Sequence, residues 1–461
     1  MMTAREENER MLAAVLGLDP EDASQRLNRS VAITAGDDPV SARFAKELAE
    51  QLERTIRIAP PSEQAELEVV IGRAPQGRAA DTLHVHVDEL SLAVTTTGSV
   101  ERSTDQAIDG LRLTFAGCYA AAPVLHRLLE MEKAGYTPTR DPFIVKFASL
   151  GIPDDLFARP IEFGDVGLAG AGAIGNGFLR ALRHLPSTGV LPIIDPKRVG
   201  KGNANRCLYF NEGDVNAPKA TLLAERAQVD FTALKLEPHV QTFSEFASRY
   251  GRIRRAIVAT DSRRVRRTIQ ADLPLEVVDA STTDIREIIV HSHRQPTDGA
   301  CLACIYRHIP EEGLREQEVA RGLGISVEDV GQGFISQEIA KKITRIHADL
   351  DPAAIVGMAF DSLFKQRCAE QRLPTAAGVQ VLAPFAFVSN LAGAYLALEM
   401  VRLNKDATGL PRTNYFFLSP WAPPNARART RRPRERDCTF CAKPQALRAM
   451  NALWADQMSN D

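Results

Sequence analysis

The sequence predicts a two-part α/β protein whose larger, C-terminal part is a doubly wound, mostly parallel sheet. Two observations predict it: strands alternate with helices from Gly164 onward, and a Gly-x-Gly-x-x-Gly loop joins the first of these strands to the first helix. Residues 137–160 contain four prolines and little periodicity, which is typical of a domain boundary. We therefore expect a smaller N-terminal α/β domain over residues 1–150 and a Rossmann-like domain over residues 151–461.

The composition is that of an ordinary globular protein, with 44% hydrophobic and 25% charged residues among 461. The net charge of -2 argues against a chain-wide basic surface for nucleic acid. The N-terminus is charged and lacks the apolar core of a secretory signal. Residues 379–403 are weakly polar but include Glu399, Arg402 and several small residues, which favours a buried helix over a membrane span. The seven cysteines, an odd number, indicate a reducing compartment, and we expect a cytoplasmic protein.

Strands and helices mix in the N-terminal part. The pattern predicts strands at 30–37 and 68–72, a hairpin over 82–96, and helices at about 40–54 and 105–132. The glycine-containing segment Gly72–Arg78 lacks the Lys-Ser/Thr pair of a phosphate-binding P-loop. We therefore assign no chemistry to this part of the chain from its own residues.

The glycine loop begins the C-terminal part. Strands are predicted at 166–170, 190–194, 256–260 and 275–279, with a helix at 173–184. In this loop Gly170 permits the turn, Gly172 admits a phosphate close to the backbone, and Gly175 lets the helix pack on the strand. Because N–H groups at a helix start favour an anion, the loop predicts a nucleotide site.

Polar side chains after the next strands indicate which nucleotide binds. Asp195 ends the second strand, where a carboxylate accepts from ribose hydroxyls. Further polar residues follow at positions suited to a triphosphate: Asn203, Arg206, Lys219 and Asp261. Arg and Lys neutralise phosphate oxygens, Asn donates a hydrogen bond, and Asp can hold Mg²⁺. The glycine loop and Asp195 alone fit an NAD-dependent oxidoreductase equally well, and the additional cluster favours ATP.

Four cysteines form two C-x-x-C pairs, Cys301–Cys304 and Cys438–Cys441. Two such pairs make a tetrahedral four-thiolate set for Zn²⁺. A closed set of this kind leaves no position for substrate, so we expect a structural zinc site that joins two distant segments. Cys118 and Cys207 are expected to be packing residues.

These residues and spacings resemble those of the ThiF/MoeB/ubiquitin-activating enzyme superfamily, over about residues 160–300 and 380–445. The resemblance is to bacterial ubiquitin-activating-enzyme-like members, which have an extra N-terminal α/β domain. It implies adenylation, by MgATP, of the C-terminal carboxylate of a ubiquitin-like β-grasp protein. By the family pattern Asp195 holds the ribose, Asp261 organises Mg²⁺, and the phosphates are engaged by Asn203, Arg206 and Lys219.

Two features depart from the family pattern. Ala173 stands where the family often has a second adjacent glycine. Homodimers of the family commonly send an arginine from an N-terminal helix into the partner's site. The sequence before Gly170 shows no clear counterpart, and Arg140 and Arg159 are the candidates. The resemblance also implies a homodimer, with the small-residue stretch 389–397 as a candidate contact.

A second, covalent step depends on Cys368. The family places its acceptor cysteine between the zinc pairs, and Cys368 lies there in a cationic context. We expect residues 305–375 to form a helical insertion that carries or covers it, with helices at 311–323 and 336–350. Thioester transfer to Cys368 would feed a conjugating enzyme. The alternatives are activation of a sulfur-carrier protein for thiocarboxylate formation, or a non-catalytic scaffold. The N-terminal domain is expected to be a degenerate adenylation-like domain or to recruit the carrier.

Overall fold

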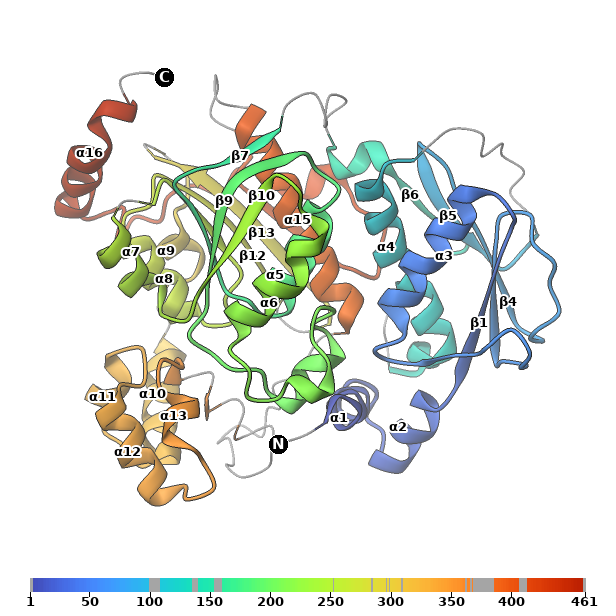
Figure 1. The fold of residues 1–461 in the computed structure, drawn as a ribbon, viewed down its shortest axis with the longest axis horizontal. Coiled ribbons are helices and arrows are strands. Elements are labelled where there is room, and N and C mark those ends of the chain that lie inside the picture. The colour runs from blue at the N-terminus through green and yellow to red at the C-terminus, as the bar shows by residue number, and fades with distance from the viewer. Residues whose placement is uncertain are drawn as a thin grey trace.

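The protein folds around two separate sheets with helices between them, and a small helical unit projects from one end (Figure 1). The computed structural model describes residues 3–98, 108–134, 140–152, 160–251, 253–282, 285–295, 297, 299–307, 310–360, 363–364, 367, 385–405 and 413–458. The predicted fold class is confirmed.

The N-terminal sheet has six strands in the order β2-β1-β3-β4-β5-β6, which are Arg57–Ile58, Ser30–Ala35, Leu67–Ile71, Thr82–Val87, Ser91–Thr95 and Phe143–Lys146. β1, β2, β3 and β4 pair in parallel, and the predicted hairpin makes β4 and β5 antiparallel. Helices α3 (Pro39–Leu52) and α4 (Gly110–Leu128) lie between this sheet and the C-terminal part, while α1 (Ala4–Leu16) and α2 (Pro20–Leu27) lie at one end (Figure 1). The N-terminal part therefore presents a helical face to the rest of the chain.

The C-terminal sheet has nine strands and provides the framework for the site. Its order is β10-β9-β8-β11-β12-β13-β14-β15, with β7 also paired to β9. The parallel strands are β7 Ile161–Phe163, β8 Val166–Ala169, β9 Ser187–Ile194, β10 Leu234–His239, β11 Arg255–Val258 and β12 Glu276–Thr282. The antiparallel strands are β13 Ile288–Arg294, β14 Tyr415–Leu418 and β15 Arg429–Thr430. The strand order reverses between β8 and β11, which opens a crevice at their carboxyl ends.

Helix α15 (Ala386–Lys405) is the buried helix that the weakly polar stretch predicts. It crosses α5 (Ala173–Leu182) so closely that a Cβ on Gly393 would lie 2.3 Å from the carbonyl carbon of Gly177. It also contacts the N-terminal helices: the hydroxyls of Tyr119 and Tyr395 are 2.7 Å apart, and Asn390 donates to Gln51. Residues 389–397, expected at a subunit interface, are therefore buried inside the chain.

The remaining helices surround the C-terminal sheet. They are α6 Lys219–Ala227, α7 Phe243–Tyr250, α8 Arg263–Ala271, α9 Leu302–Ile305 and α16 Pro444–Met458. In the described part of the chain, no helix is long and apolar enough to cross a membrane.

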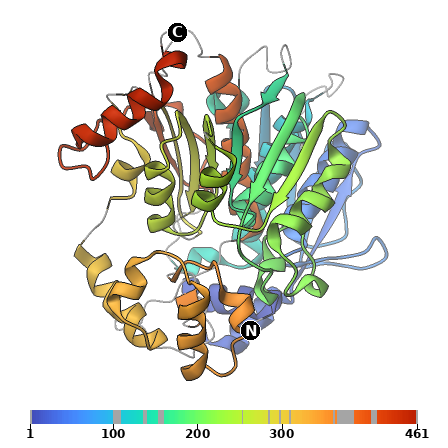
Figure 2. The ribbon, with the colours of Figure 1, turned by 60° about the vertical axis from the view of Figure 1, so that its left-hand side comes forward.

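A helical insertion lies between α9 and α15, and it is the orange unit in Figures 1 and 2. Its helices are α10 Pro310–Leu323, α11 Val327–Gly331, α12 Gln337–Ile346 and α13 Pro352–Ile355. Apolar residues such as Leu323, Ile339 and Phe360 give it a core of its own. Arg264 on α8 ties it to the sheet domain through Glu316 and the carbonyl of Val330.

Candidate active site

A cavity of about 780 Å³ opens at the carboxyl ends of β8, β9, β11 and β12. All but one of the residues predicted to bind the nucleotide line it: Gly170, Gly172, Asp195, Asn203, Arg206, Lys219 and Asp261. Gly175 does not line the cavity and lies in the first turn of α5. The structure thus brings together residues from four separate segments of the sequence.

The glycine loop has the geometry that its sequence predicts. Gly170 has φ +110, and a Cβ there would lie 2.7 Å from the carbonyl oxygen of Ala259. A Cβ on Gly175 would lie 2.2 Å from the carbonyl oxygen of Gly170, so this position needs glycine for the helix to pack on the loop. Gly172 is different, because a Cβ there would meet no atom within 4 Å. Gly172 lines the cavity at the N-terminus of α5, where the backbone N–H groups favour an anion.

Asp195 is buried at the end of β9 and holds two backbone segments. Its Oδ2 accepts from the N–H of Ala171 at 2.8 Å, inside the glycine loop. Its Oδ1 accepts from the N–H of Lys197, also at 2.8 Å. A carboxylate oxygen has more than one lone pair, so Asp195 can still accept from a ligand hydroxyl in the cavity.

Asp261 faces a cation that the sequence analysis did not single out. The Nζ of Lys197 lies 2.7 Å from Oδ1 of Asp261, and both residues line the cavity. The only sequence signal for Lys197 is its place two residues after Asp195, beyond the end of a strand. When a ligand with phosphate groups and a bound cation enters the cavity, Lys197 can pair with a phosphate and Asp261 with the cation.

The phosphate-binding candidates lie on short elements after β9. The 3-10 helix η3 (Lys201–Asn205) carries Asn203, whose Oδ1 accepts from the N–H of Gly200 at 2.9 Å, so that its NH₂ group is left to donate. Arg206 ends η3 and donates from Nη1 to Oδ1 of Asn205 at 2.7 Å. Lys219 begins α6, and burial lowers the pKa of its amine, against the opposing charge of Asp195. An added anion would raise that pKa and be neutralised by the ammonium.

Two distant segments also reach the cavity, and sequence reasoning missed both. Helix α1 contributes Glu7 and Arg10, which are paired at 2.9 Å. The insertion contributes Asp349 and Asp351, with apolar neighbours around them. Arg10 thus places a cation from an N-terminal helix of the same chain at the cavity. Arg140 is exposed and does not line the cavity, and Arg159 lies outside the described residues.

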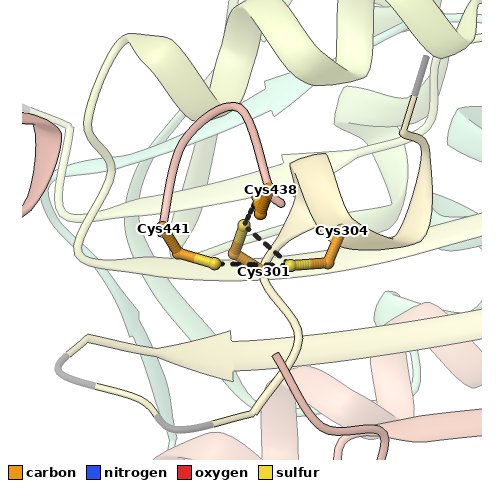
Figure 3. Close-up of side chains that lie close together, drawn as sticks. All are labelled: Cys301, Cys304, Cys438 and Cys441. Carbon is orange, nitrogen blue, oxygen red and sulfur yellow. Dashed lines mark hydrogen bonds between the residues drawn. The ribbon is translucent and has the colours of Figure 1, made fainter. Parts of the chain in front are cut away.

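The four paired cysteines come together in one cluster, as the spacing predicts (Figure 3). Their sulfurs all lie within 4.8 Å of one another, and the hydrogen-bonded pairs are separated by 3.4–3.7 Å. Sulfurs at the corners of a tetrahedron with Zn–S bonds of ~2.3 Å would be about 3.8 Å apart. The four buried thiols therefore suit a zinc ion that joins α9 to the segment before α16.

The three cysteines outside this cluster are Cys118, Cys207 and Cys368. Cys118 is fully buried in α4, as expected. Cys207 is also buried and lies at the cavity wall, and burial raises the pKa of its thiol. Cys368, the predicted acceptor, lies outside the described residues.

Two family models match consecutive parts of the chain. A family model described as the ThiF family matches residues 152–440, and one described as the E1 N-terminal domain matches residues 1–153. The uncharacterized protein y4jF of Sinorhizobium fredii (strain NBRC 101917 / NGR234) is 28% identical in an alignment of 318 residues, which covers 64% of this chain and 60% of that protein. The chain thus spans about three fifths of the length of this relative.

Solved structures of E. coli MccB are also similar. One contains AMPCPP and selenomethionine MccA, and the other contains MccA-N7isoASN. They are 13% and 14% identical, cover 70% of this chain and 74% of theirs, and have a TM-score of 0.35. A likeness of this degree adds no evidence about substrate or mechanism.

Proposed function

The chain belongs to the ThiF family of ATP-dependent adenylating enzymes, and from this premise we propose that it adenylates the C-terminal carboxylate of a ubiquitin-like β-grasp protein. The acyl group then passes to Cys368 as a thioester. The observation that carries the first step is the cavity, where a glycine loop, a ribose-type aspartate and several cations face one space.

The charges of the cavity suit a polyphosphate. Among the described residues, eight Lys and Arg line it against five Asp and Glu. A triphosphate brings several negative charges and needs such a surplus, since unpaired anions are costly to remove from water. A nicotinamide dinucleotide carries fewer phosphate charges, which makes an oxidoreductase the weaker proposal.

In the proposed first step a carboxylate oxygen of the carrier attacks the α-phosphorus of ATP. The bond from that phosphorus to the bridging oxygen breaks, pyrophosphate leaves, and an acyl-adenylate forms. Asp195 holds the ribose, Asn203, Arg206 and Lys219 hold the phosphates, and Arg10 adds charge from α1. Asp261 would hold Mg²⁺, which supplies further charge neutralisation when bound. Positioning and electrostatic stabilisation account for the rate.

In the proposed second step the thiolate of Cys368 attacks the acyl carbonyl. A C–S bond forms, the C–O bond to the phosphate breaks, and AMP leaves. The support is sequence context, because Lys365, Arg367 and Arg372 lie within four residues of this cysteine in the sequence and cations favour the thiolate. The thioester would then be passed to a conjugating enzyme.

We also propose that the two domains have different roles in the reaction. Residues 151–461 perform the chemistry, and the insertion at about 305–375 carries Cys368. Residues 1–150 occupy the helical face where a second subunit would dock, and α1 supplies Arg10 to the site. The site is thereby assembled within one chain.

The test is pyrophosphate release by purified protein with MgATP and a ubiquitin-like carrier encoded beside it. We expect release by the wild type and a loss of at least 100-fold in Asp261→Asn. Asp165→Asn, an exposed aspartate at the turn before β8, is the matched control and should match the wild type. Wild-type activity in Asp261→Asn would overturn the assigned mechanism.

Intact mass resolves the second step. With Cys368→Ala we expect unchanged pyrophosphate release and no thiol-sensitive adduct between enzyme and carrier. A carrier thiocarboxylate formed with a sulfur donor, without such an adduct in the wild type, would favour sulfur-carrier activation instead.

A further inference from the structure

A chain of buried hydrogen bonds runs from the N-terminal part of the protein to Arg206. Asn8 on α1 is 2% exposed, and its Nδ2 donates to the carbonyl of Arg54 at 2.7 Å. Its Oδ1 accepts from Nδ2 of Asn205 at 3.0 Å. The Oδ1 of Asn205, which is fully buried, in turn accepts from Nη1 of Arg206 at 2.7 Å. Each amide in this chain uses one donor and one acceptor, so each fixes the orientation of the next.

Two further contacts hold the same segment. The guanidinium of Arg54, at the end of α3, donates to the carbonyls of Ala204, Leu208 and Phe210 at 3.2–3.3 Å. On the other side α1 lies so close to η3 that a Cβ on Gly202 would be 2.6 Å from Cγ of Glu7. The segment that bears Asn203 and Arg206 is therefore held between α1 and the end of α3.

We propose that Asn8 is a positioning residue for Arg206. This inference rests on the proposed function, in which Arg206 engages the phosphates of ATP. An arginine side chain has many rotamers, and ordering it on a ligand costs free energy. The relay through Asn205 orders one nitrogen of the guanidinium before the nucleotide arrives and leaves the other donors for phosphate.

The removal of Asn8 has a specific consequence. The NH₂ group of Asn205 would lose its acceptor in a buried place, where an unpaired donor is costly. Asn205 would then turn to a new partner, and Arg206 would lose its fixed acceptor. Catalysis and ATP affinity should both fall, although neither Asn8 nor Asn205 is among the residues lining the cavity.

The experiment compares Asn8→Leu, Asn8→Asp and Leu12→Val, each also combined with Arg206→Ala. Asn8→Leu removes the relay at similar volume, while Asn8→Asp keeps the oxygen that accepts from Asn205. Leu12→Val disturbs the buried face of the same helix without touching the relay. The readouts are ATP affinity by calorimetry without a carrier, kcat and KM for pyrophosphate release, and the thermal midpoint.

We expect Asn8→Leu to weaken ATP binding and lower kcat about 10-fold each, with KM for the carrier unchanged. Asn8→Asp should recover part of the ATP affinity, and Leu12→Val should bind ATP as the wild type does even if its midpoint falls. In the Arg206→Ala background, Asn8→Leu should have no further effect. If Asn8→Leu does not fold, the same double-mutant cycle is measured with Asn8→Asp in the wild-type and Arg206→Ala proteins.

Each failure has a distinct meaning. Wild-type protein that binds no ATP overturns the proposed function and this inference with it. Wild-type protein that binds ATP, together with wild-type affinity in Asn8→Leu, overturns the relay alone. An equal loss from Asn8→Leu with and without Arg206 would also overturn it, since Asn8 would then act through another group such as Arg10.

Discussion

Gly170 and Gly172 lie in the same loop, but the chain needs glycine there for different reasons. At Gly170 the backbone has φ +110 and the Cβ direction points at the carbonyl of Ala259, so the fold itself excludes a side chain. At Gly172 no protein atom lies within 4 Å of the position that a Cβ would take, so an added side chain would contact only a ligand in the cavity. Two substitutions of the same size therefore separate folding from binding.

We expect Gly170→Ala to lower the free energy of unfolding by about 2 kcal/mol or more, because it adds positive-φ strain to a backbone clash. Gly172→Ala should unfold as the wild type does, yet bind ATP at least 10-fold more weakly if a phosphate occupies the open side. Denaturant unfolding and calorimetry with ATP measure the two effects. Wild-type ATP affinity in Gly172→Ala would contradict the assignment of phosphate to this loop.

The residues proposed to bind the nucleotide could be chosen from the sequence because their signals are local. The glycine loop follows a strand directly, and Asp195 and Asp261 stand just after the ends of two others. Arg10 and Asp349 could not be predicted in this way, since they reach the cavity from distant elements whose docking depends on tertiary packing. Lys197 was predictable in principle as a cation beside a strand-end aspartate, but one such residue is indistinguishable from a solvated lysine.

At the scale of elements, the four cysteines join two short pieces of chain, which the main chain also links where the N–H of Ala300 donates to the carbonyl of Arg432 at 2.8 Å. Helix α9 has only four residues, and the segment between β14 and α16 is irregular apart from the short 3-10 helix η7 (Ala426–Ala428) and β15. Apolar residues of both pieces, among them Leu302 and Phe440, also belong to one buried cluster. A bound zinc ion would cross-link the two pieces at one point.

We therefore expect one zinc per chain by elemental analysis, and loss of that zinc in Cys438→Ser. Because metal-binding free energy becomes folding free energy, the variant should lose several kcal/mol of stability, and protease should cut first near α16. Chelation of the wild type should have the same effect. A zinc-free protein of unchanged stability would show that the four thiols are packing residues.

The predicted elements matched best where the periodicity was strong. The strands at 30–37, 68–72 and 166–170 correspond to β1, β3 and β8, and the helix at 40–54 to α3. The antiparallel edge formed by β13, β14 and β15 was not predicted, because β14 and β15 are separated from β13 in sequence by the insertion. Their pairing is a long-range contact, and a short strand carries little pattern of its own.

At the scale of the whole molecule, the two halves meet through α3, α4, α5 and α15. Buried ion pairs cross this junction, since Arg180 on α5 contacts Glu47 at 3.4 Å and also pairs with Glu50 on α3. His184 lies beside them, accepting from Nε of Arg183 at 3.2 Å. Burial, with the charges of Arg183, Arg180 and Arg43, lowers the pKa of His184 to about 4, against a weaker opposing effect of Asp109.

This lowered pKa predicts an acid-sensitive junction. Above pH 6.5 His184 is neutral in both the folded and the unfolded chain, so it does not change stability. Between pH 6.5 and 4 the unfolded chain takes up the proton and the folded chain does not, so stability falls as the pH falls, by about 3 kcal/mol in all. In His184→Gln this part of the slope should disappear, and denaturant unfolding from pH 7 to 4 measures it. Acid loss of zinc affects both proteins alike, so an identical slope would contradict the assignment.

The same junction bears on how many chains make one active site. A homodimer through residues 389–397 would need a surface that α5 and the N-terminal helices already cover. Since α1 of the same chain also reaches the cavity, a second copy is not required for its walls. We expect pyrophosphate release per chain to be constant from nanomolar to micromolar enzyme, with one ATP bound per chain. Sedimentation at the same concentrations tests the point directly, because activity that appears only with a dimer would mean that the partner completes the site.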